Sequence, residues 1–219
     1  MTYSFSDRPQ VIFLDAVGTL FGVQGSVGEQ YATVAQRFGV ALSPAKINQA
    51  FFASFKAASA PAFPACPPVE LPQREYDWWY AIAVQTFTQA DAKHLFPDFE
   101  AFFVMLYAHF ATPDAWFVYP DVIPTLERWQ HQGIPLAILS NFDSRLYTVL
   151  QVLNLKSYFS SITISSEAGA AKPDRHIFEV ALSKHAIDPH QALHIGDSFT
   201  EDYQAAKTAG LRARWLRRP

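Results

Sequence analysis

Short, predominantly apolar runs stand at four places along this chain, at 11–14, 134–139, 162–164 and 192–195. They are rich in β-branched and other large apolar residues, and each is too short to be a buried helix. Such runs are typical of strands that are buried on both faces of a parallel sheet. The pattern therefore predicts four strands of one sheet.

Between and after the later runs, apolar residues recur at helical spacing. In 120–132, for example, Val122, Leu126 and Trp129 share one face, and Gly133 follows as a helix-ending residue. The helices predicted in this half of the chain are 120–132, 144–153, 175–185 and 201–209. Strands that alternate with helices predict right-handed βαβ units, and hence an α/β fold with a doubly wound, Rossmann-like parallel sheet.

The stretch 22–118 breaks this alternation. It contains helical patterns at 28–38, 44–58, 74–88 and 99–110, and no convincing strand. We therefore predict an all-helical domain, 22–118, inserted after the first strand of an α/β core made of 1–21 and 119–219. A proline-rich stretch at 61–72 predicts an irregular, semi-rigid loop within the insert.

Aromatic residues are concentrated in the second half of this insert. They are Trp78, Trp79, Tyr80, Phe87, Phe96, Phe99, Phe102, Phe103, Tyr107 and Phe110. We interpret them as the packing core of the helical domain and its contact surface with the α/β domain, in preference to a ligand site.

The overall composition bounds the function. Half of the residues are hydrophobic and 17% are charged, which is typical of a folded globular chain. A formal charge of −3 and a pI near 6.1 predict neither nucleic acid nor an anionic membrane as a partner. Four C-terminal arginines are too few for a polybasic segment and are interpreted as a solvated tail: Arg212, Arg214, Arg217 and Arg218.

The one cysteine, Cys66, has no partner for an intramolecular disulfide, which favours a reducing compartment. Residues 1–9 lack the apolar centre of a signal peptide, and no apolar run approaches the roughly 20 residues that span a bilayer. We therefore expect a soluble, cytoplasmic protein. The sequence leaves its oligomeric state open.

Polar residues follow the predicted strands in four clusters, which are Asp15 to Thr19, Ser140 with Asn141, Lys172 with Pro173, and Gly196 with Asp197 and Asp202. A single polar residue at a strand end is commonly a turn former or a helix cap. In open parallel sheets, however, binding sites form at the carboxyl ends of the strands. Together the clusters contain a nucleophile, an anion donor, a cation and an acidic pair.

These clusters carry a resemblance to a known family. Residues 15–20, Asp-Ala-Val-Gly-Thr-Leu, resemble the first signature of the haloacid dehalogenase-like superfamily, which is usually Asp-x-Asp-x-Thr. Ser140 is similar to its second signature, Lys172 to its third, and Gly196-Asp197 with Asp202 to its fourth. The helical insert resembles the cap domain that this family carries just after its nucleophile loop. The resemblance implies a hydrolase that acts on a small, phosphorylated molecule.

The resemblance implies a role for each acidic residue. Asp15 would attack phosphorus and form an aspartyl-phosphate, which divides one difficult displacement into two steps. Asp15, Asp197 and Asp202, with the backbone carbonyl of Val17, would hold Mg²⁺ through oxygen ligands.

The remaining motif residues would bind the phosphoryl group. Lys172 supplies positive charge, and Ser140 donates a hydrogen bond to a non-bridging oxygen. Gly18 permits a tight turn that brings backbone N–H groups to the phosphate, and Thr19 braces that turn. Asn141, beside Ser140, completes the expected substrate-binding set.

One position departs from the family pattern. Phosphatases of this family carry a second Asp two residues after the nucleophile, and this chain has Val17 there, which cannot transfer a proton. General acid–base catalysis typically contributes about 10²–10⁴-fold to the rate. Three interpretations remain open: a Mg²⁺-dependent phosphatase that is slow on alkyl phosphates, a metal-free 2-haloacid dehalogenase, and a non-catalytic protein that binds a phosphorylated ligand.

Overall fold

The structure, a computed structural model, describes residues 8–218. The predicted core segment 1–21 and the polar segment 1–9 both begin outside these residues. Within the described part of the chain, no helix combines the length and the apolar character needed to cross a membrane.

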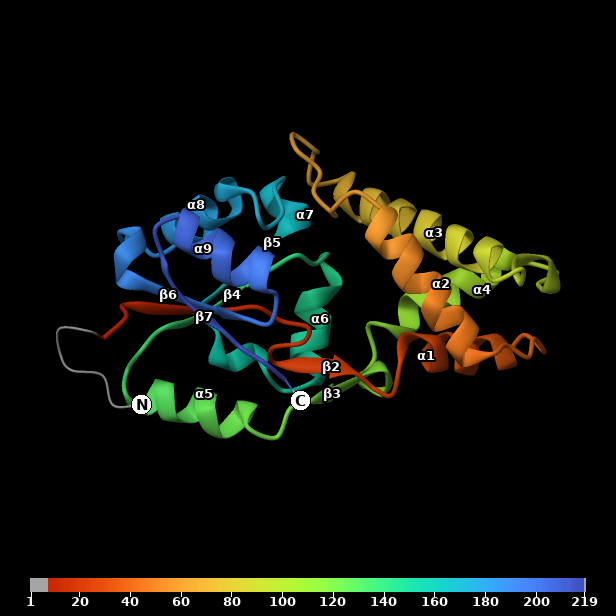
Figure 1. The fold of residues 1–219 in the computed structure, drawn as a ribbon, viewed down its shortest axis with the longest axis horizontal. Helices are drawn as coiled ribbons and strands as arrows, with labels where there is room; N and C mark the ends of the chain where they lie inside the picture. The colour runs from red at the N-terminus through yellow and green to blue at the C-terminus, as the bar shows by residue number, and fades with distance from the viewer. Residues whose placement is uncertain (1–7, 219) are drawn as a thin grey trace.

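A parallel sheet forms the centre of the α/β part (Figure 1). Among residues 8–218 it has five strands in the order β5-β4-β1-β6-β7. Their bounds are β1 Val11–Leu14, β4 Leu136–Ser140, β5 Ser161–Ile164, β6 Ala192–Gly196 and β7 Arg212–Trp215. In register, Phe13 of β1 lies between Ala137 of β4 and His194 of β6. All residues of β1 are buried, as the apolar run at 11–14 predicts.

Helices cover both faces of the sheet, so the predicted doubly wound α/β fold is confirmed. Ile12 and Leu14 pack with α5 (Val122–His131) and α6 (Arg145–Val152) on one face. Phe13, because side chains alternate along a strand, packs on the other face. The helices of that face are α8 (Arg175–Ser183) and α9 (Ala205–Thr208). A short helix, α7 (Ser165–Ala168), follows β5.

A helical domain is inserted after the first strand, as predicted, and stands to one side of the sheet (Figure 1). Its helices are α1 Val27–Gln36, α2 Pro44–Ala57, α3 Leu71–Gln89 and α4 Phe99–His109. Phe87 of α3 lies at its centre, in ring contact with Tyr31, Phe96, Phe99 and Phe102. The interpretation of these aromatic residues as a packing core is therefore correct for the buried ones, which are Phe87, Phe96, Phe99, Phe102 and Phe103.

The prediction of no strand within 22–118 is wrong. β2 (Phe21–Val23) pairs antiparallel with β3 (Trp116–Val118), so the chain leaves and re-enters the α/β part through one two-stranded ribbon. Strands of three residues are too short for a periodic signal, and their pairing joins segments far apart in sequence. The predicted boundaries at 21/22 and 118/119 fall in or beside this ribbon and stay predictions.

The interpretation of the C-terminal arginines as a solvated tail is also wrong. Arg212 and Arg214 belong to β7, which pairs with β6 at the edge of the sheet. Arg218 forms an ion pair with Asp121 at 2.5 Å, and its guanidinium lies 4.0 Å from the ring centre of Tyr119. This edge strand is only partly buried, so it lacks the apolar run that identified the inner strands.

Candidate active site at the carboxyl edge of the sheet

The loop after β1 places Asp15 at the carboxyl edge of the sheet. The Asp15 side chain is buried, and its backbone N–H donates to the Ile195 carbonyl on β6 at 3.0 Å. Gly18 has a φ of +82°, and a Cβ there would collide with the Asp197 carboxylate. Glycine is therefore required both for the turn and for the approach of Asp197. Thr19 is buried beneath the turn, with its hydroxyl 3.4 Å from Asp197 Oδ1.

The fourth cluster follows β6. Asp202 lies on a π-helical turn, Phe199–Gln204, and its Oδ2 accepts the Ser198 backbone N–H at 2.9 Å. Gly196 lies directly beneath it, because a Cβ at that position would overlap the Asp202 carboxylate. Single π-helical turns are frequent at functional sites, where they redirect a side chain. Here the turn directs Asp202 toward Asp15.

Lys172 joins the two acidic clusters. Its Nζ donates to Asp15 Oδ1 at 2.7 Å and to Asp202 Oδ1 at 2.5 Å, and its side chain is 2% exposed. Asn141 holds the backbone of Lys172: its Oδ1 accepts the Lys172 N–H at 2.7 Å, and its Nδ2 donates to the Lys172 carbonyl at 2.9 Å. Both polar atoms of Asn141, which was expected to bind substrate, thus position the lysine.

Three carboxylates converge at this point. Asp15, Asp197 and Asp202 each offer an oxygen, and these oxygens lie within 4.8 Å of one another. The backbone of Val17 belongs to the same loop, and its side chain lines the cavity beside them. Ser140, buried at the end of β4, lines the same cavity. The structure thus brings together the residues that the sequence placed at separate strand ends.

The electrostatics of this cluster favour a cation. Burial, with the neighbouring Asp15 and Asp202 carboxylates, raises the pKa of Asp197 to about 6. Burial also raises the pKa of Asp15, although Lys172 opposes this shift. Burial alone would lower the pKa of Lys172, but Asp15 and Asp202 more than offset it and hold the pKa above its ordinary value. A divalent cation would relieve the excess of carboxylates over cations, and hard cations prefer oxygen ligands.

Sequence reasoning missed His194, a fully buried residue in the apolar run of β6. Its Nε2 lies 2.8 Å from Asp202 Oδ1. Burial by itself raises the pKa of Asp202, but the contacts with His194 and Lys172 outweigh it and leave the pKa below its ordinary value. His194 therefore helps to keep Asp202 ionised. A histidine within an otherwise apolar strand was the signal that could have identified it.

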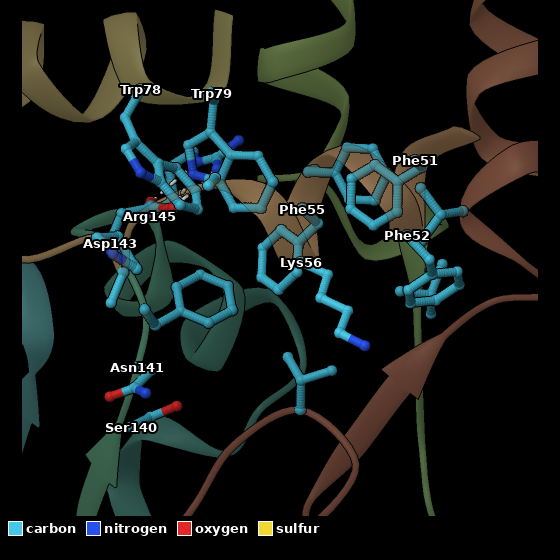
Figure 2. Close-up of a pocket in the computed structure, with 18 of the residues that line it drawn as sticks. Phe51, Phe52, Phe55, Lys56, Trp78, Trp79, Ser140, Asn141, Asp143 and Arg145 are labelled. Atoms are coloured by element: carbon cyan, nitrogen blue, oxygen red, sulfur yellow. Dashed lines mark hydrogen bonds and ion pairs between the residues drawn. The ribbon is translucent and has the colours of Figure 1, made fainter. Parts of the chain in front are cut away.

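A cavity of about 650 Å³ opens above these groups, between the sheet edge and the helical domain. Figure 2 shows Ser140 and Asn141 on its core side and residues of α2 and α3 on the opposite side. The aromatic residues of the insert that line it are Tyr31, Phe51, Phe52, Phe55, Trp78, Trp79, Phe103, Tyr107, Phe110 and Trp116. The prediction that the aromatic cluster of the insert is packing alone is therefore incomplete, since five of its members form a wall of the cavity.

A buried polar network joins the helical domain to the core beside this cavity. Asp143 and Arg145 form an ion pair at 2.8 Å, and Trp79 of α3 donates to Asp143 Oδ2 at 2.7 Å. Arg145 also donates to the Tyr107 carbonyl at 3.1 Å, and its guanidinium lies 3.8 Å from the centre of that ring. Burial alone would raise the pKa of Asp143, but Arg145 holds it below its ordinary value.

A second set of contacts crosses the same interface. Glu75 of α3 accepts the Ser144 backbone N–H at 2.9 Å and also the Ser144 hydroxyl, at the start of α6. In the irregular 58–70 segment, the Pro61 carbonyl accepts the Ser165 hydroxyl at 2.8 Å. The position of the helical domain over Asp15 is therefore fixed by directed hydrogen bonds as well as by apolar packing.

We expect Asp143→Ala to lower the free energy of unfolding by roughly 3–5 kcal/mol, because it leaves the buried Arg145 guanidinium without its carboxylate. Urea unfolding measures the change. The control is Glu179→Ala, which removes the exposed ion pair with Arg175 and should cost less than about 1 kcal/mol. Equal effects of the two substitutions would contradict an energetic role for the buried network.

Comparisons with known proteins show which family this chain matches. The family model for haloacid dehalogenase-like hydrolases matches residues 9–210. A bovine protein, haloacid dehalogenase-like hydrolase domain-containing protein 3, is 34% identical over 202 residues, which are 91% of this chain and 78% of that protein.

Two solved structures show the same fold. An L-2-haloacid dehalogenase matches with a TM-score of 0.73 at 19% identity, covering 95% of this chain and 84% of the other. The Bacillus subtilis protein YfnB, solved bound to magnesium, matches with a TM-score of 0.67 at 16% identity, covering 95% and 89%. Both structures therefore share the fold of this chain, which agrees with the match to the family model.

Proposed function

We propose that this chain, which belongs to the haloacid dehalogenase-like hydrolase family, is a Mg²⁺-dependent phosphatase that acts on a small phosphorylated molecule and has an impaired proton-transfer step. The observation that carries the proposal is the cluster of Asp15, Asp197 and Asp202 around Lys172, at the base of a cavity large enough for a metabolite. Such a cavity with converging charged groups is the ordinary form of a small-molecule site.

In the proposed reaction, Asp15 attacks phosphorus from the base of the cavity. Its carboxylate oxygen forms a bond to phosphorus while the bond to the leaving oxygen breaks, and water then hydrolyses the aspartyl-phosphate. Lys172, 2.7 Å from Asp15, supplies positive charge against the phosphoryl oxygens. Ser140 and the backbone N–H groups around Gly18 are the further donors that we assign to those oxygens.

Asp15, Asp197 and Asp202, with the carbonyl of Val17, are the residues that we assign to Mg²⁺. The bound ion would offset the repulsion between the phosphoryl group and the carboxylates. The raised pKa of Asp197 supports this assignment, because an acid whose ionised form is disfavoured by neighbouring carboxylates gains most from an added cation.

Mg²⁺ should stabilise the folded protein, by about 2.7 kcal/mol when its concentration is 100 times the dissociation constant. For a chain of this size that corresponds to a rise in Tm of roughly 5–10 °C. Asp197→Asn should abolish most of the rise, since Asp197 belongs to the acidic cluster. Thermal unfolding with and without millimolar Mg²⁺, and with added beryllofluoride as a phosphoryl mimic, measures the effect.

The control for this measurement is Glu201→Gln. Glu201 lines the same cavity but lies outside the cluster of three carboxylates, so this variant should keep the response to Mg²⁺. A response that survives in Asp197→Asn would place the metal elsewhere in the protein.

A 2-haloacid dehalogenase is the second candidate, because Val17 leaves the site without the proton-transferring Asp of the phosphatases. In that reaction Asp15 would attack carbon and displace halide without a metal. The test is phosphate release from an aryl phosphate with and without Mg²⁺, beside halide release from 2-chloropropionate. Metal-dependent phosphate release supports the phosphatase, metal-free halide release supports the dehalogenase, and neither activity supports a phospho-ligand binding protein.

A further inference from the structure

The wall of the cavity opposite Asp15 bears unusually exposed aromatic rings. Phe52 and Phe55 of α2 are 56% and 41% exposed, although both line the cavity. Large apolar side chains gathered in one concave place are typical of a binding site rather than of ordinary surface. Figure 2 shows Phe55 beside Trp79, whereas Phe52 lies farther along α2, beside Phe51.

The rings of this wall meet one another both face to face and edge to face. Phe55 stacks on Phe51 with an interplanar angle of 23° and a centroid distance of 5.6 Å, and on Trp79 with 26° and 5.9 Å. Trp78 meets Phe55 edge-on, at 81°. Aromatic groups bind planar partners through such faces and edges. The wall therefore complements a flat, apolar group better than a hydroxylated sugar, which would lose hydration there without gaining hydrogen bonds.

Two cationic residues line this part of the cavity, Lys56 of α2 and Arg145 at the interface with the core (Figure 2). Arg145 is paired with Asp143, and so its guanidinium is already engaged. Lys56 is the one of these two cations that no ion pair among the described residues engages, and the Trp79 indole N–H already donates to Asp143. A sugar with several hydroxyl groups would need more donors than this single ammonium, and the rest of the wall offers rings.

Val17 gives an independent argument about the substrate, because it restricts the leaving group. With no proton donor at this position, the leaving oxygen must depart as a stable anion. An aryl or enol oxide satisfies this requirement, and a sugar alkoxide does not. The chemistry at the base of the cavity and the shape of its wall therefore favour the same class of molecule.

We infer that the substrate of the proposed phosphatase is a phosphate monoester of a planar, apolar and acidic hydroxyl group, with its ring against Phe55 and its phosphoryl group at Asp15. The inference rests on the proposed function. Asp15 forms a bond to phosphorus, the bond from phosphorus to the aryl oxygen breaks, and the electron pair leaves with the aryl oxide, which is protonated by solvent. Water then attacks phosphorus, loses a proton to solvent, and releases inorganic phosphate and the Asp15 carboxylate.

The test compares kcat/KM for 2-naphthyl phosphate and phenyl phosphate, whose leaving groups have similar acidity but different ring area. The second ring should add about tenfold in kcat/KM, since its apolar surface is buried against the aromatic wall. Glucose 6-phosphate, with an alkoxide leaving group, should react more slowly than either. In Phe55→Ala, and in Phe52→Ala as a second variant, the ratio of naphthyl to phenyl should fall toward one.

The matched control is Phe117→Ala. Phe117 is a similarly exposed phenylalanine that does not line the cavity, so the ratio should stay at its wild-type value. Mg²⁺-dependent hydrolysis with equal kcat/KM for the naphthyl and phenyl esters would overturn the inference and leave the proposed function intact.

Absence of phosphate release from every ester would instead overturn the proposed function. A binding measurement then still decides the inference about the cavity. Calorimetry with Mg²⁺ present should show that wild type binds a naphthyl phosphonate about tenfold or more tightly than methylphosphonate, and that Phe55→Ala loses this difference. Equal affinity of wild type for the two phosphonates would overturn the inference.

Discussion

Val17→Asp is expected to raise kcat/KM for alkyl phosphates by about 10²–10⁴-fold, which corresponds to roughly 3–5 kcal/mol of activation free energy. The substituted side chain would lie in the loop that carries Asp15 and would face the same cavity. There it could protonate the leaving oxygen and then accept a proton from the attacking water. Aryl phosphates should gain less in the first step, because their leaving groups depart as stable anions.

Steady-state kinetics on one alkyl and one aryl phosphate, after both proteins are shown to be folded, measures this gain. Val17→Asn is the matched control: asparagine has nearly the same size and polarity as aspartate but cannot transfer a proton. Some loss of stability should accompany both substitutions, since Val17 packs partly against the apolar core. If Val17→Asp brings no gain on either substrate, the cavity does not position a phosphoester, and the dehalogenase or binding function would replace the proposal.

Lys172→Met is expected to lower both catalytic activity and stability, and to increase the stabilisation by Mg²⁺. The kcat/KM for any phosphate ester should fall by at least about 10²–10³-fold, because the positive charge beside Asp15 is lost. The free energy of unfolding without metal should fall by roughly 3–5 kcal/mol, because Asp15 and Asp202 become buried carboxylates without a cation. The rise in Tm caused by Mg²⁺ should then be larger than in wild type, since the ion takes over their neutralisation.

Thermal and urea unfolding at several Mg²⁺ concentrations, together with kinetics, test this expectation. Lys46→Met on the surface of α2 is the control and should change neither activity nor the metal response. A smaller Mg²⁺ response in Lys172→Met would show that the lysine supports the metal site rather than competing with it for the carboxylates.

The local pattern of the sequence was enough to predict the central strands and the positions of the charged groups. The apolar runs at 11–14, 134–139 and 192–195 correspond to β1, β4 and β6, because strands buried on both faces need continuous apolar character. Once these strands are parallel neighbours, their carboxyl ends share one edge. Asp15, Lys172 and Asp202 consequently meet, as the strand-end clusters indicated.

Only the tertiary structure decided the features that depend on pairs of distant residues. β2 and β3 are too short to be recognised singly, and they form because each completes the other's backbone hydrogen bonds. His194 is conspicuous as a histidine in an apolar strand, but only the tertiary structure shows that its partner is Asp202, 2.8 Å away.

The tertiary structure also decided which side chains of the helical domain face the site. Its aromatic periodicity predicted helices but could not tell which rings pack inside and which face the cavity, since both classes satisfy the same amphipathic pattern. Phe87 is fully buried among other rings of the helical domain, whereas Phe55 is 41% exposed and lines the cavity, and this difference arises from how the helices pack against one another. Docking depends on Asp143, Arg145 and Trp79, whose burial is stable only because each supplies the partner that another needs. The sequence by itself therefore determined which charged residues follow the inner strands and meet at the sheet edge, and the tertiary structure decided the shape of the space above them.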